Sequence, residues 1–323
     1  MPTDALSEVL RAVRLSGSMF FRLRLRSPFA VTALGVQEVI DQFAPEARQV
    51  LPFHLVTRGP IWADIEGVST PLRLDEGDIV VLPRGATHSL TDRPGTPPTS
   101  VTELRSSISG NPPTLVWGGT GDPSEALCGF FHYRSRLFDP LLNALPEVLV
   151  IRHDPERSPW LTATLEHTFN ESLAQRAGGD AMVSRLVELL FLEVVQRYLE
   201  DGDGTGWFAA LNDPIVGAAL SHLHAEPERP WTLEALSHEV GASRSTLSER
   251  FTETVGLSPI RYLTEWRMEL AAQRLEQTRD SVAEVATAVG YDSEAAFSRA
   301  FKRHTGEPPA AWRRRQHATA ASA

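Results

Sequence analysis

The sequence of 323 residues contains a single cysteine, Cys128, and a single lysine, Lys302. One cysteine excludes an intramolecular disulfide and is typical of proteins in the reducing cytoplasm. No apolar run reaches the roughly 18 residues that indicate a transmembrane helix. The first residues also lack the basic start, apolar core and small-residue cleavage site of a secretory signal. The sequence therefore predicts a cytoplasmic protein with no membrane segment.

The chain also lacks an excess of positive charge. Its formal net charge is −10 at pH 7, which at first argues against a nucleic-acid-binding protein. The charge is unevenly distributed, because residues 214–315 hold 13 Arg and Lys against 14 Asp and Glu, a net charge of −1. Any binding to nucleic acid would therefore depend on where individual arginines are placed, and not on a strongly basic domain.

One pattern occurs twice between residues 231 and 315. Each copy has apolar residues at helical spacing, then a glycine and a serine that can cap a second helix. The second helices carry apolar residues at i and i+4, namely Leu247 and Phe251, then Phe297 and Phe301. Two short helices joined by a glycine-containing turn form a helix-turn-helix, whose second helix can enter the major groove of DNA. A plain helical hairpin is the alternative for one copy, and two copies in register favour the helix-turn-helix.

Residues 259–278, between the copies, are expected to form one long helix, and residues 214–223 an earlier one that begins at Pro214. At 1.5 Å per residue the long helix would measure roughly 30 Å. That length is close to one helical turn of DNA, about 34–36 Å, the spacing that two recognition helices need to meet successive major grooves.

The first half of the chain favours β structure. Short strands separated by turns rich in glycine, proline and aspartate are expected at residues 20–26, 53–56, 61–65, 71–74, 79–82, 115–117 and 127–133. Such frequent short strands indicate a sandwich or a barrel. Residues 92–113, which are rich in proline, threonine and serine, are expected to form an exposed excursion.

Amphipathic segments flank the β region. Residues 4–15, 159–176 and 180–200 are each expected to form a helix with one apolar face. The glycine-rich run at 201–206 has no apolar anchor and is typical of a flexible linker. Because the last two helices carry apolar stripes beside a linker, we expect them to form a dimer contact.

Residues 214–315 resemble the DNA-binding domain of the AraC/XylS family of bacterial transcription regulators. The resemblance is carried by the double helix-turn-helix, by Trp266-Arg-Met, and by the run from Gly290-Tyr-Asp-Ser to Lys302-Arg with Gly306-Glu-Pro-Pro after it. Residues 4–200 resemble the cupin-type effector domain of one branch of that family. The resemblance implies an α+β chain with an N-terminal cupin-like β-barrel or sandwich and flanking helices, followed by an all-α DNA-binding domain.

This resemblance implies four segments and a function. The segments are a cupin-like effector-binding domain at 1–151, a helical dimerisation segment at 152–200, the linker at 201–206 and the double helix-turn-helix domain at 207–317. The implied protein is a signal-responsive, sequence-specific transcription regulator and homodimer with no enzymatic activity and no cofactor. Its implied partners are double-stranded promoter DNA, an unknown small-molecule effector and RNA polymerase. The resemblance is typical of activators, although the residues leave activation and repression both open.

The resemblance places the recognition helices on residues 243–254 and 293–304. The expected DNA contacts in the first are Arg244, Ser245, Thr246, Ser248, Glu249 and Arg250. Those in the second are Ser293, Glu294, Ala295, Ser298, Arg299, Lys302 and Arg303. Arginine is the natural bidentate partner of guanine, so the first helix, with small hydroxyls and a glutamate outward, is expected to contact few bases directly. Ser243 and Ser293 are expected mainly as helix caps. For Arg313–Arg315, phosphate contact and a solvated chain end remain equally open.

The run from Gly77 to His88 resembles the second cupin motif, in which the histidine of cupin enzymes binds a metal. The first cupin motif should supply His-x-His and a later glutamate, whereas here only His54 is present and Glu66 is a doubtful third ligand. A metal site normally needs at least three such ligands. We therefore predict no metal, with His54 and His88 as weak candidates.

The favoured alternative is a small-molecule pocket that includes His54, Trp62, His88, Cys128 and His132. A purely structural role for His88 in a turn is the other interpretation. For Cys128, packing inside a strand and redox sensing both remain open. A metal-dependent cupin enzyme with a helical appendage is the alternative function, and the missing His-x-His argues against it.

Overall fold

The computed structural model describes residues 16–45, 47, 49–110, 113–133, 142–154, 164, 167, 179–200 and 207–321. The described residues divide into two compact units, of which one holds 16–133 and 145–200 and the other holds 142–144 and 207–321. The helix expected at 4–15 and the linker expected at 201–206 lie outside the described residues, as does all but residues 164 and 167 of the helix expected at 159–176.

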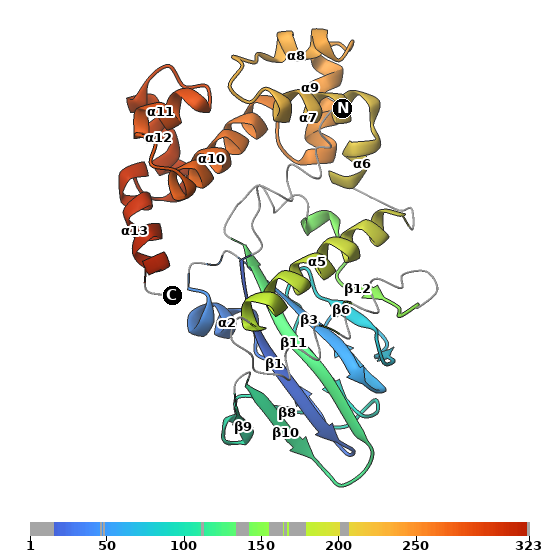
Figure 1. Ribbon diagram of the computed structural model, residues 1–323. Coiled ribbons are helices and arrows are strands. Elements are labelled where there is room, and N and C mark those ends of the chain that lie inside the picture. Colours follow the sequence, from blue (N-terminus) through green and yellow to red (C-terminus); the bar gives the residue numbers. More distant parts are fainter. Residues whose placement is uncertain are drawn as a thin grey trace. The chain divides into compact units, whose positions relative to one another are not determined.

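The N-terminal unit contains two β-sheets (Figure 1). The seven-stranded sheet consists, in spatial order, of β12 (Leu149–Ile151), β6 (Ile79–Val81), β3 (Gln49–Arg58), β11 (Pro123–Tyr133), β1 (Ser16–Arg26), β10 (Thr114–Gly118) and β9 (Ile108–Ser109). The five-stranded sheet consists of β5 (Leu72–Leu74), β4 (Ile61–Ile65), β7 (His88–Thr91), β2 (Ala30–Thr32) and β8 (Thr99–Ser100). These described strands form two open sheets and no closed barrel, so of the two expected forms the sandwich is present.

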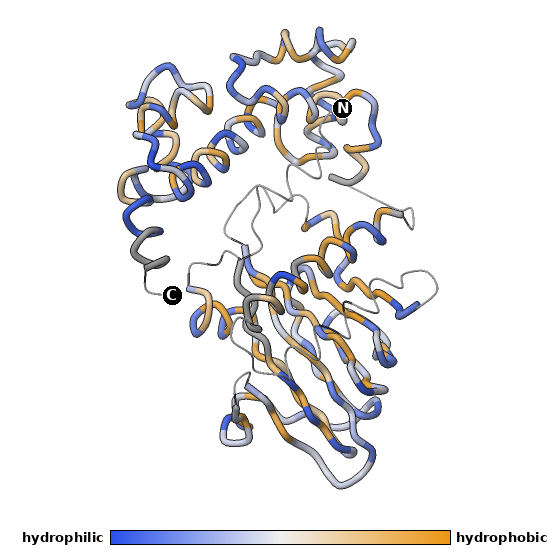
Figure 2. Tube along the Cα trace, viewed as in Figure 1, coloured by the Kyte–Doolittle hydropathy of each residue, from blue (hydrophilic) through white to orange (hydrophobic). Residues whose placement is uncertain are grey.

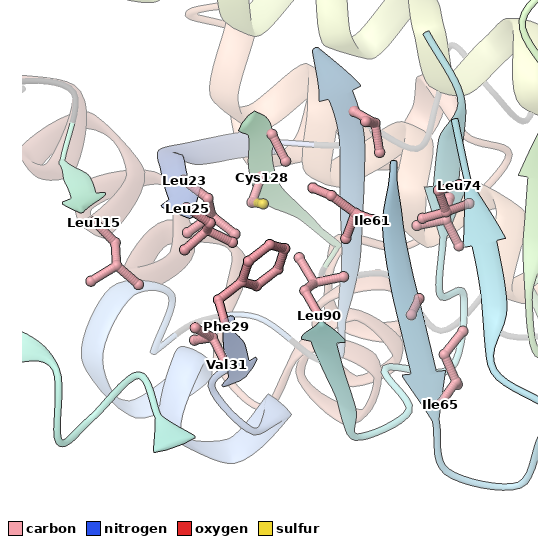
Figure 3. Packing of buried hydrophobic residues seen from close by; sticks show 14 of the residues in the cluster. Leu23, Leu25, Phe29, Val31, Ile61, Ile65, Leu74, Leu90, Leu115 and Cys128 are labelled. Carbon is pink, nitrogen blue, oxygen red and sulfur yellow. The ribbon is translucent and has the colours of Figure 1, made fainter. Parts of the chain in front are cut away.

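Alternation along the strands explains where the core lies. In β1, Leu23 and Leu25 are buried while Arg24 between them is exposed, because successive side chains of a strand point to opposite faces. The main apolar cluster combines Leu25 and neighbours from the larger sheet with Ile61 and Leu90 from the smaller one, as Figure 3 shows. Figure 2 shows the same preference as hydrophobic stretches along the strands, with hydrophilic residues at several turns. The core therefore lies between the two sheets.

Two segments differ from the sequence-based expectation. Residues 92–113 are only partly an exposed excursion, because they contain β8, the 3₁₀ helix η1 (Arg105–Ser107) and β9, and Leu104 among them is buried. A short helix, α2 (Val36–Phe43), was not predicted. Its signal is present in the sequence, since Val36, Val39 and Phe43 recur at helical spacing. The pattern is short and lies within a β-rich region, so it is easily overlooked.

The helix expected at 180–200 is present as α5 (Gly179–Glu200). Its residues Phe191 and Val194 pack on the face of the larger sheet formed by Phe53, Leu55 and Phe131. That face is opposite to the one that lines the core between the sheets. None of the described helices combines the length and the apolar character needed to cross a membrane.

The C-terminal unit is helical and contains both predicted repeats. Its elements are α6 (Trp207–Asn212), α7 (Pro214–Ala225), α8 (Leu233–Glu239), α9 (Arg244–Val255), α10 (Pro259–Gln277), α11 (Val282–Ala288), α12 (Glu294–Thr305) and α13 (Pro309–Ala321). The expected long helix is α10, and it joins the group α6–α9 to the group α11–α13 (Figure 1). Two elements, α6 and α13, were not predicted.

Helix α10 contributes to the core of both groups. Tyr262 and Trp266 in its first half are buried against the group α6–α9, where His224 of α7 stacks on the Trp266 ring at 4.3 Å. Met268 and Leu275 in its second half are buried in a cluster with the aromatic residues of α12. One continuous helix therefore carries both helix-turn-helix units.

Candidate nucleic-acid interface and internal cavity

The first candidate recognition helix is α9, and its N-terminus is capped as predicted. The Ser243 hydroxyl accepts a hydrogen bond from the Thr246 N–H at 3.1 Å. The same oxygen lies 2.9 Å from the Ser245 hydroxyl and 2.8 Å from that of Thr246. Arg244, Ser245 and Glu249 are exposed, whereas Leu247 is buried. The expected DNA-facing positions therefore lie on the outer surface, with small hydroxyls partly bonded to each other.

Arg250, on the outer face of α9, forms an ion pair with another residue of the same domain. Its Nη1 lies 3.3 Å from Asp213 Oδ2. Asp213 also caps α7 by accepting hydrogen bonds from the Ile215 and Val216 N–H groups at 2.8 and 3.0 Å. The guanidinium of Arg250 thus helps to hold α7, which leaves Arg244 as the arginine of α9 that has no ion pair among the described residues.

The second candidate recognition helix, α12, presents more positive charge. The Ser293 hydroxyl accepts from the Ala296 N–H at 3.4 Å, so Ser293 is a cap as predicted. Phe297 and Phe301 are fully buried. The outward residues are Glu294, Ala295, Arg299, Lys302 and Arg303, all exposed, with Ser298 half-buried. Within the described part of the chain neither Arg299 nor Lys302 forms an ion pair, so both side chains are available to an anion.

Arg267 of α10 connects the two repeats. Its Nε donates to the Pro227 carbonyl at 2.6 Å and its Nη2 to the Arg229 carbonyl at 2.8 Å, both in the loop before α8. Its guanidinium also lies 5.9 Å from the ring centre of Tyr291, in the turn between α11 and α12. The loop that leads into the first repeat and a turn of the second therefore meet at one arginine, which stabilises their relative positions.

Two of the three arginines at residues 313–315 contact other residues of the same domain. Arg313 donates from Nε to the Leu275 carbonyl at 3.2 Å and from Nη2 to the Asp280 carbonyl, so it caps the C-terminus of α10. Arg315 pairs with Glu307 at 2.7 Å and lies over the Trp312 ring at 4.7 Å. Both side chains therefore contact residues of their own domain.

An internal cavity of about 480 Å³ lies within the β domain. Its walls are overwhelmingly apolar and come from both sheets, α2 and the segment around η1, including Phe21, Leu23, Val31, Val39, Phe43, Leu90, Val101, Ile108, Leu115 and Phe130. Gln42 and Arg105 also line it and are exposed, with Arg105 Nη2 donating to Gln42 Oε1 at 3.2 Å, so they mark where the cavity meets solvent. The volume lies within the range of about 300–1,000 Å³ that is usual for small-molecule sites.

Three polar side chains meet in the wall of this cavity. His54 Nδ1 lies 2.8 Å from Cys128 Sγ, and His54 Nε2 lies 2.6 Å from His88 Nε2. His88 Nδ1 lies 2.9 Å from the Ala86 carbonyl oxygen. All three side chains are buried. His54 and Cys128 come from β3 and β11, which are paired in the larger sheet, and His88 comes from β7 of the smaller sheet, which faces them across the core.

The carbonyl partner of His88 determines which atom donates and which accepts in each of these hydrogen bonds. A carbonyl oxygen only accepts, so Nδ1 of His88 carries the proton and Nε2 of His88 is an acceptor. His54 Nε2 therefore donates to His88, and His54 Nδ1 accepts from the thiol of Cys128. Burial lowers the pKa of His54 and of His88, so both imidazoles are neutral. Burial raises the pKa of the Cys128 thiol, which is therefore protonated.

Two of the five residues expected in the pocket do not line it. Trp62 alternates with the buried Ile61 and Ala63 of β4, so its side chain points to the other face of the sheet. His132 is buried on β11 but lies beyond Phe130, where the cavity ends. Among the described residues no group of three His, Cys, Asp or Glu is arranged to hold a metal ion, and Glu66 is exposed.

A cupin family model matches residues 4–200, and a helix-turn-helix domain model matches residues 236–315. A putative AraC-like transcription regulator of Streptomyces lividans is 33% identical over 271 residues, which cover 83% of this chain and 88% of that protein. The chain belongs to the AraC-like transcription regulators. The HTH-type transcriptional regulator AlkR of Acinetobacter baylyi is 29% identical over 317 residues, covering 96% of this chain and 99% of AlkR. The solved DNA-binding domain of AdpA in complex with a target DNA is 32% identical over 33% of this chain and 96% of that domain, with a TM-score of 0.32.

As an AraC-like regulator, the chain binds DNA through its helix-turn-helix domain. Its relatives are transcription regulators and not enzymes, so the alternative of a metal-dependent cupin enzyme is not supported. Sequence reasoning missed Arg267, although it lies inside the Trp266-Arg-Met motif that carried the resemblance. It also missed the apolar lining from α2 and the η1 segment, because neither element was predicted.

Proposed function

We propose that this AraC-like regulator contacts promoter DNA with α9 and α12 in two successive major grooves, and that a small molecule in the cavity controls the binding. The observation that supports the first part is the pair of capped helices held on one continuous helix, α10. The 19 residues of α10 correspond to roughly 28 Å at 1.5 Å per residue. Selection of binding sites from a random DNA pool by the full-length chain tests this. The expected motif has two parts about 10 base pairs apart, and a single short motif would contradict the proposal.

Arg299→Ala should weaken binding at one base position of that motif. Arg299 is exposed on α12 and forms no ion pair with the described residues, so its guanidinium can reach a guanine edge. The expected cost is about 1–3 kcal/mol against the preferred base, with little change for DNA that already carries another base there. Fluorescence anisotropy with a set of single-substituted sites measures this. The control is Arg279→Ala, which removes one exposed arginine outside both recognition helices. A uniform loss over all sites would mark Arg299 as a phosphate contact instead.

We also propose that α5 forms the dimer contact with a second copy of this chain. Met182 and Leu189 on this helix are large apolar side chains that are 45% and 49% exposed, so a partner would bury them. Leu189→Glu should therefore shift the chain toward monomer, while Gln196→Glu, on an exposed position of the same helix, should not. Sedimentation velocity over a concentration series measures the shift, and equal behaviour of the two variants would rule out this surface.

The cavity supports the proposed effector, because it is apolar, opens to solvent beside Gln42 and Arg105, and is large enough for a small molecule. A ligand that binds one conformation of the regulator better than another would shift the DNA-binding equilibrium by that difference in affinity.

We further propose that the DNA-bound dimer activates transcription through RNA polymerase in the cytoplasm. In vitro transcription from a selected promoter, with and without the regulator, tests activation against repression.

A further inference from the structure

The cavity wall contains a nucleophile, a base and a group that orients the base. We propose that the cavity captures an apolar α,β-unsaturated aldehyde or ketone by covalent addition of its β-carbon to Cys128, with His54 as the base. This inference rests on the proposed effector role of the cavity and names the chemical class of the effector. It also assigns to Cys128 a reaction that needs no oxidant.

The hydrogen bonds run in the direction that such an addition requires. The thiol of Cys128 donates to His54 Nδ1 at 2.8 Å, so a base lies within reach of its proton. Because burial keeps both groups neutral at rest, the proton moves to His54 only as the Sγ–Cβ bond forms. His54 Nε2 in turn donates to His88 at 2.6 Å, and the Ala86 carbonyl holds the ring of His88. This second bond keeps His54 in the tautomer whose Nδ1 is free to accept a proton. His54 is therefore oriented by a third group, as in the triads of nucleophilic enzymes.

The addition is balanced without a further reactant. The Sγ–Cβ bond forms as the carbon–carbon double bond of the ligand breaks, and its electrons move toward the carbonyl as an enolate. The proton of the Cys128 thiol passes to His54 Nδ1 and is then delivered to the α-carbon of the ligand. The product is a thioether in which no atom has left, and both imidazoles return to the neutral state.

The surroundings select for an apolar electrophile. Burial raises the pKa of Cys128, so the resting group is a neutral thiol and not a thiolate exposed to polar reagents. The cavity wall beside it is formed by Leu23, Leu90 and other apolar side chains. A hydrocarbon tail therefore gains binding energy from burial, while a charged alkylating agent loses its hydration on entry. The thiol reacts only with a molecule that the cavity has already bound.

The experiment uses the full-length chain with three compounds, 3-decen-2-one, its saturated analogue 2-decanone, and the charged reagent iodoacetate. Intact-protein mass spectrometry follows the adduct, and because Cys128 is the only cysteine the modified thiol is unambiguous. The ratio of the rates with 3-decen-2-one and iodoacetate is compared between the native chain and the chain unfolded in urea. The native fold is expected to raise this ratio at least tenfold, and an unchanged ratio would overturn the proposal.

Variants separate the role of each group. Cys128→Ser should form no adduct. His54→Gln should form the adduct about a hundredfold more slowly, the usual contribution of a general base. His132→Gln, which changes another buried histidine of the same domain outside the cavity, is the matched control and should react at the wild-type rate. A wild-type adduct rate in His54→Gln would show that His54 is not the base.

The saturated ketone 2-decanone separates binding in the cavity from covalent addition to Cys128, because it can bind but cannot form the thioether. Binding of 2-decanone, detected as a rise in the melting temperature of the full-length chain, supports the cavity as an effector site. Binding without any adduct from 3-decen-2-one would overturn covalent capture alone. No binding of either ketone would overturn the effector role of the cavity itself, while the DNA-binding experiments would be unaffected.

Discussion

Gly290→Ala should destabilise the C-terminal domain much more than Gly241→Ala, although the two glycines occupy the same position in the two repeats. Both have positive φ, +80° and +64°, so alanine is unfavourable at either site by about 1–2 kcal/mol. Their surroundings differ. A Cβ on Gly290 would lie 2.5 Å from the Glu228 carbonyl oxygen and 2.7 Å from Arg267 Nη2, whereas nothing lies within 4 Å of a Cβ on Gly241.

The added methyl group at Gly290 would displace the contact between the two repeats. The nearest obstacle is backbone, so the loop before α8 has to move, and the two hydrogen bonds that Arg267 donates to it are put at risk. Hydrogen bonds of a charged donor are worth about 1.5–3 kcal/mol each. We therefore expect a loss of about 3–5 kcal/mol in the free energy of unfolding of this domain, against about 1–2 kcal/mol for Gly241→Ala.

Urea denaturation of the full-length chain measures the loss of stability, and anisotropy with the selected two-part DNA site measures the loss of affinity. Because Arg267 holds the repeats in their relative positions, affinity for the two-part site should fall at least tenfold in Gly290→Ala under conditions where the domain remains folded. Gly241→Ala is the matched control, since it has the same backbone strain and no clash. Equal effects of the two substitutions would refute a specific role for the contact at Gly290.

The helical domain could be predicted closely because its signals are local. Caps such as Ser243 and Ser293 precede apolar residues at helical spacing, and the second copy of the pattern confirms the first. The contacts that join the repeats could not be predicted in this way. Arg267 lies 40 residues from Pro227, and nothing in a helical period says which loop a side chain of α10 will meet.

The cavity shows a different limit. Its three polar side chains are 34 and 74 positions apart, so they meet only after β3 has paired with β11 and the sheet that contains β7 has packed on theirs. The motif around His88 indicated this region of the fold, and the structure places His54 and Cys128 beside His88 in the cavity wall. Trp62 and His132 were also expected in the pocket, but neither lines the cavity. Strand alternation turns Trp62 to the other face of β4, and His132 lies beyond Phe130 on β11. The part of the apolar wall that α2 contributes was not predicted, because α2 itself was not predicted, although its apolar residues recur at helical spacing.

Two buried histidines should make the stability of the two halves of the helical domain depend on pH in opposite directions. In the second repeat, His304 of α12 lies 2.7 Å from Glu265 and 2.9 Å from Glu269, both on α10. Burial opposes a charge on His304, but the hydrogen bonds to these two carboxylates outweigh it and raise its pKa to about 9. On α7, which packs with the first repeat, burial against Tyr262 and Trp266 lowers the pKa of His224 to about 4.

The direction of each effect follows from comparison with an unfolded histidine, whose pKa is about 6.5. The charged His304 stabilises the fold fully below pH 6.5, and its contribution is lost as the pH rises through 9. The neutral His224 stabilises the fold above pH 6.5, and its contribution is lost as the pH falls toward 4. A shift of this size corresponds to about 3 kcal/mol at each site. The second repeat should therefore weaken in alkali and the first in acid.

Hydrogen exchange followed by mass spectrometry resolves the two repeats within the full-length chain. After correction for the intrinsic exchange rate, peptides from α12 should lose protection between pH 7 and 9.5, and peptides from α7 and α9 between pH 6.5 and 4.5. His304→Gln should abolish the alkaline loss and leave the acid loss unchanged, because it removes only the charged group between Glu265 and Glu269. If both repeats lose protection together at either extreme, α10 couples them so tightly that they unfold as one unit, and the separate responses proposed for the two histidines would be wrong.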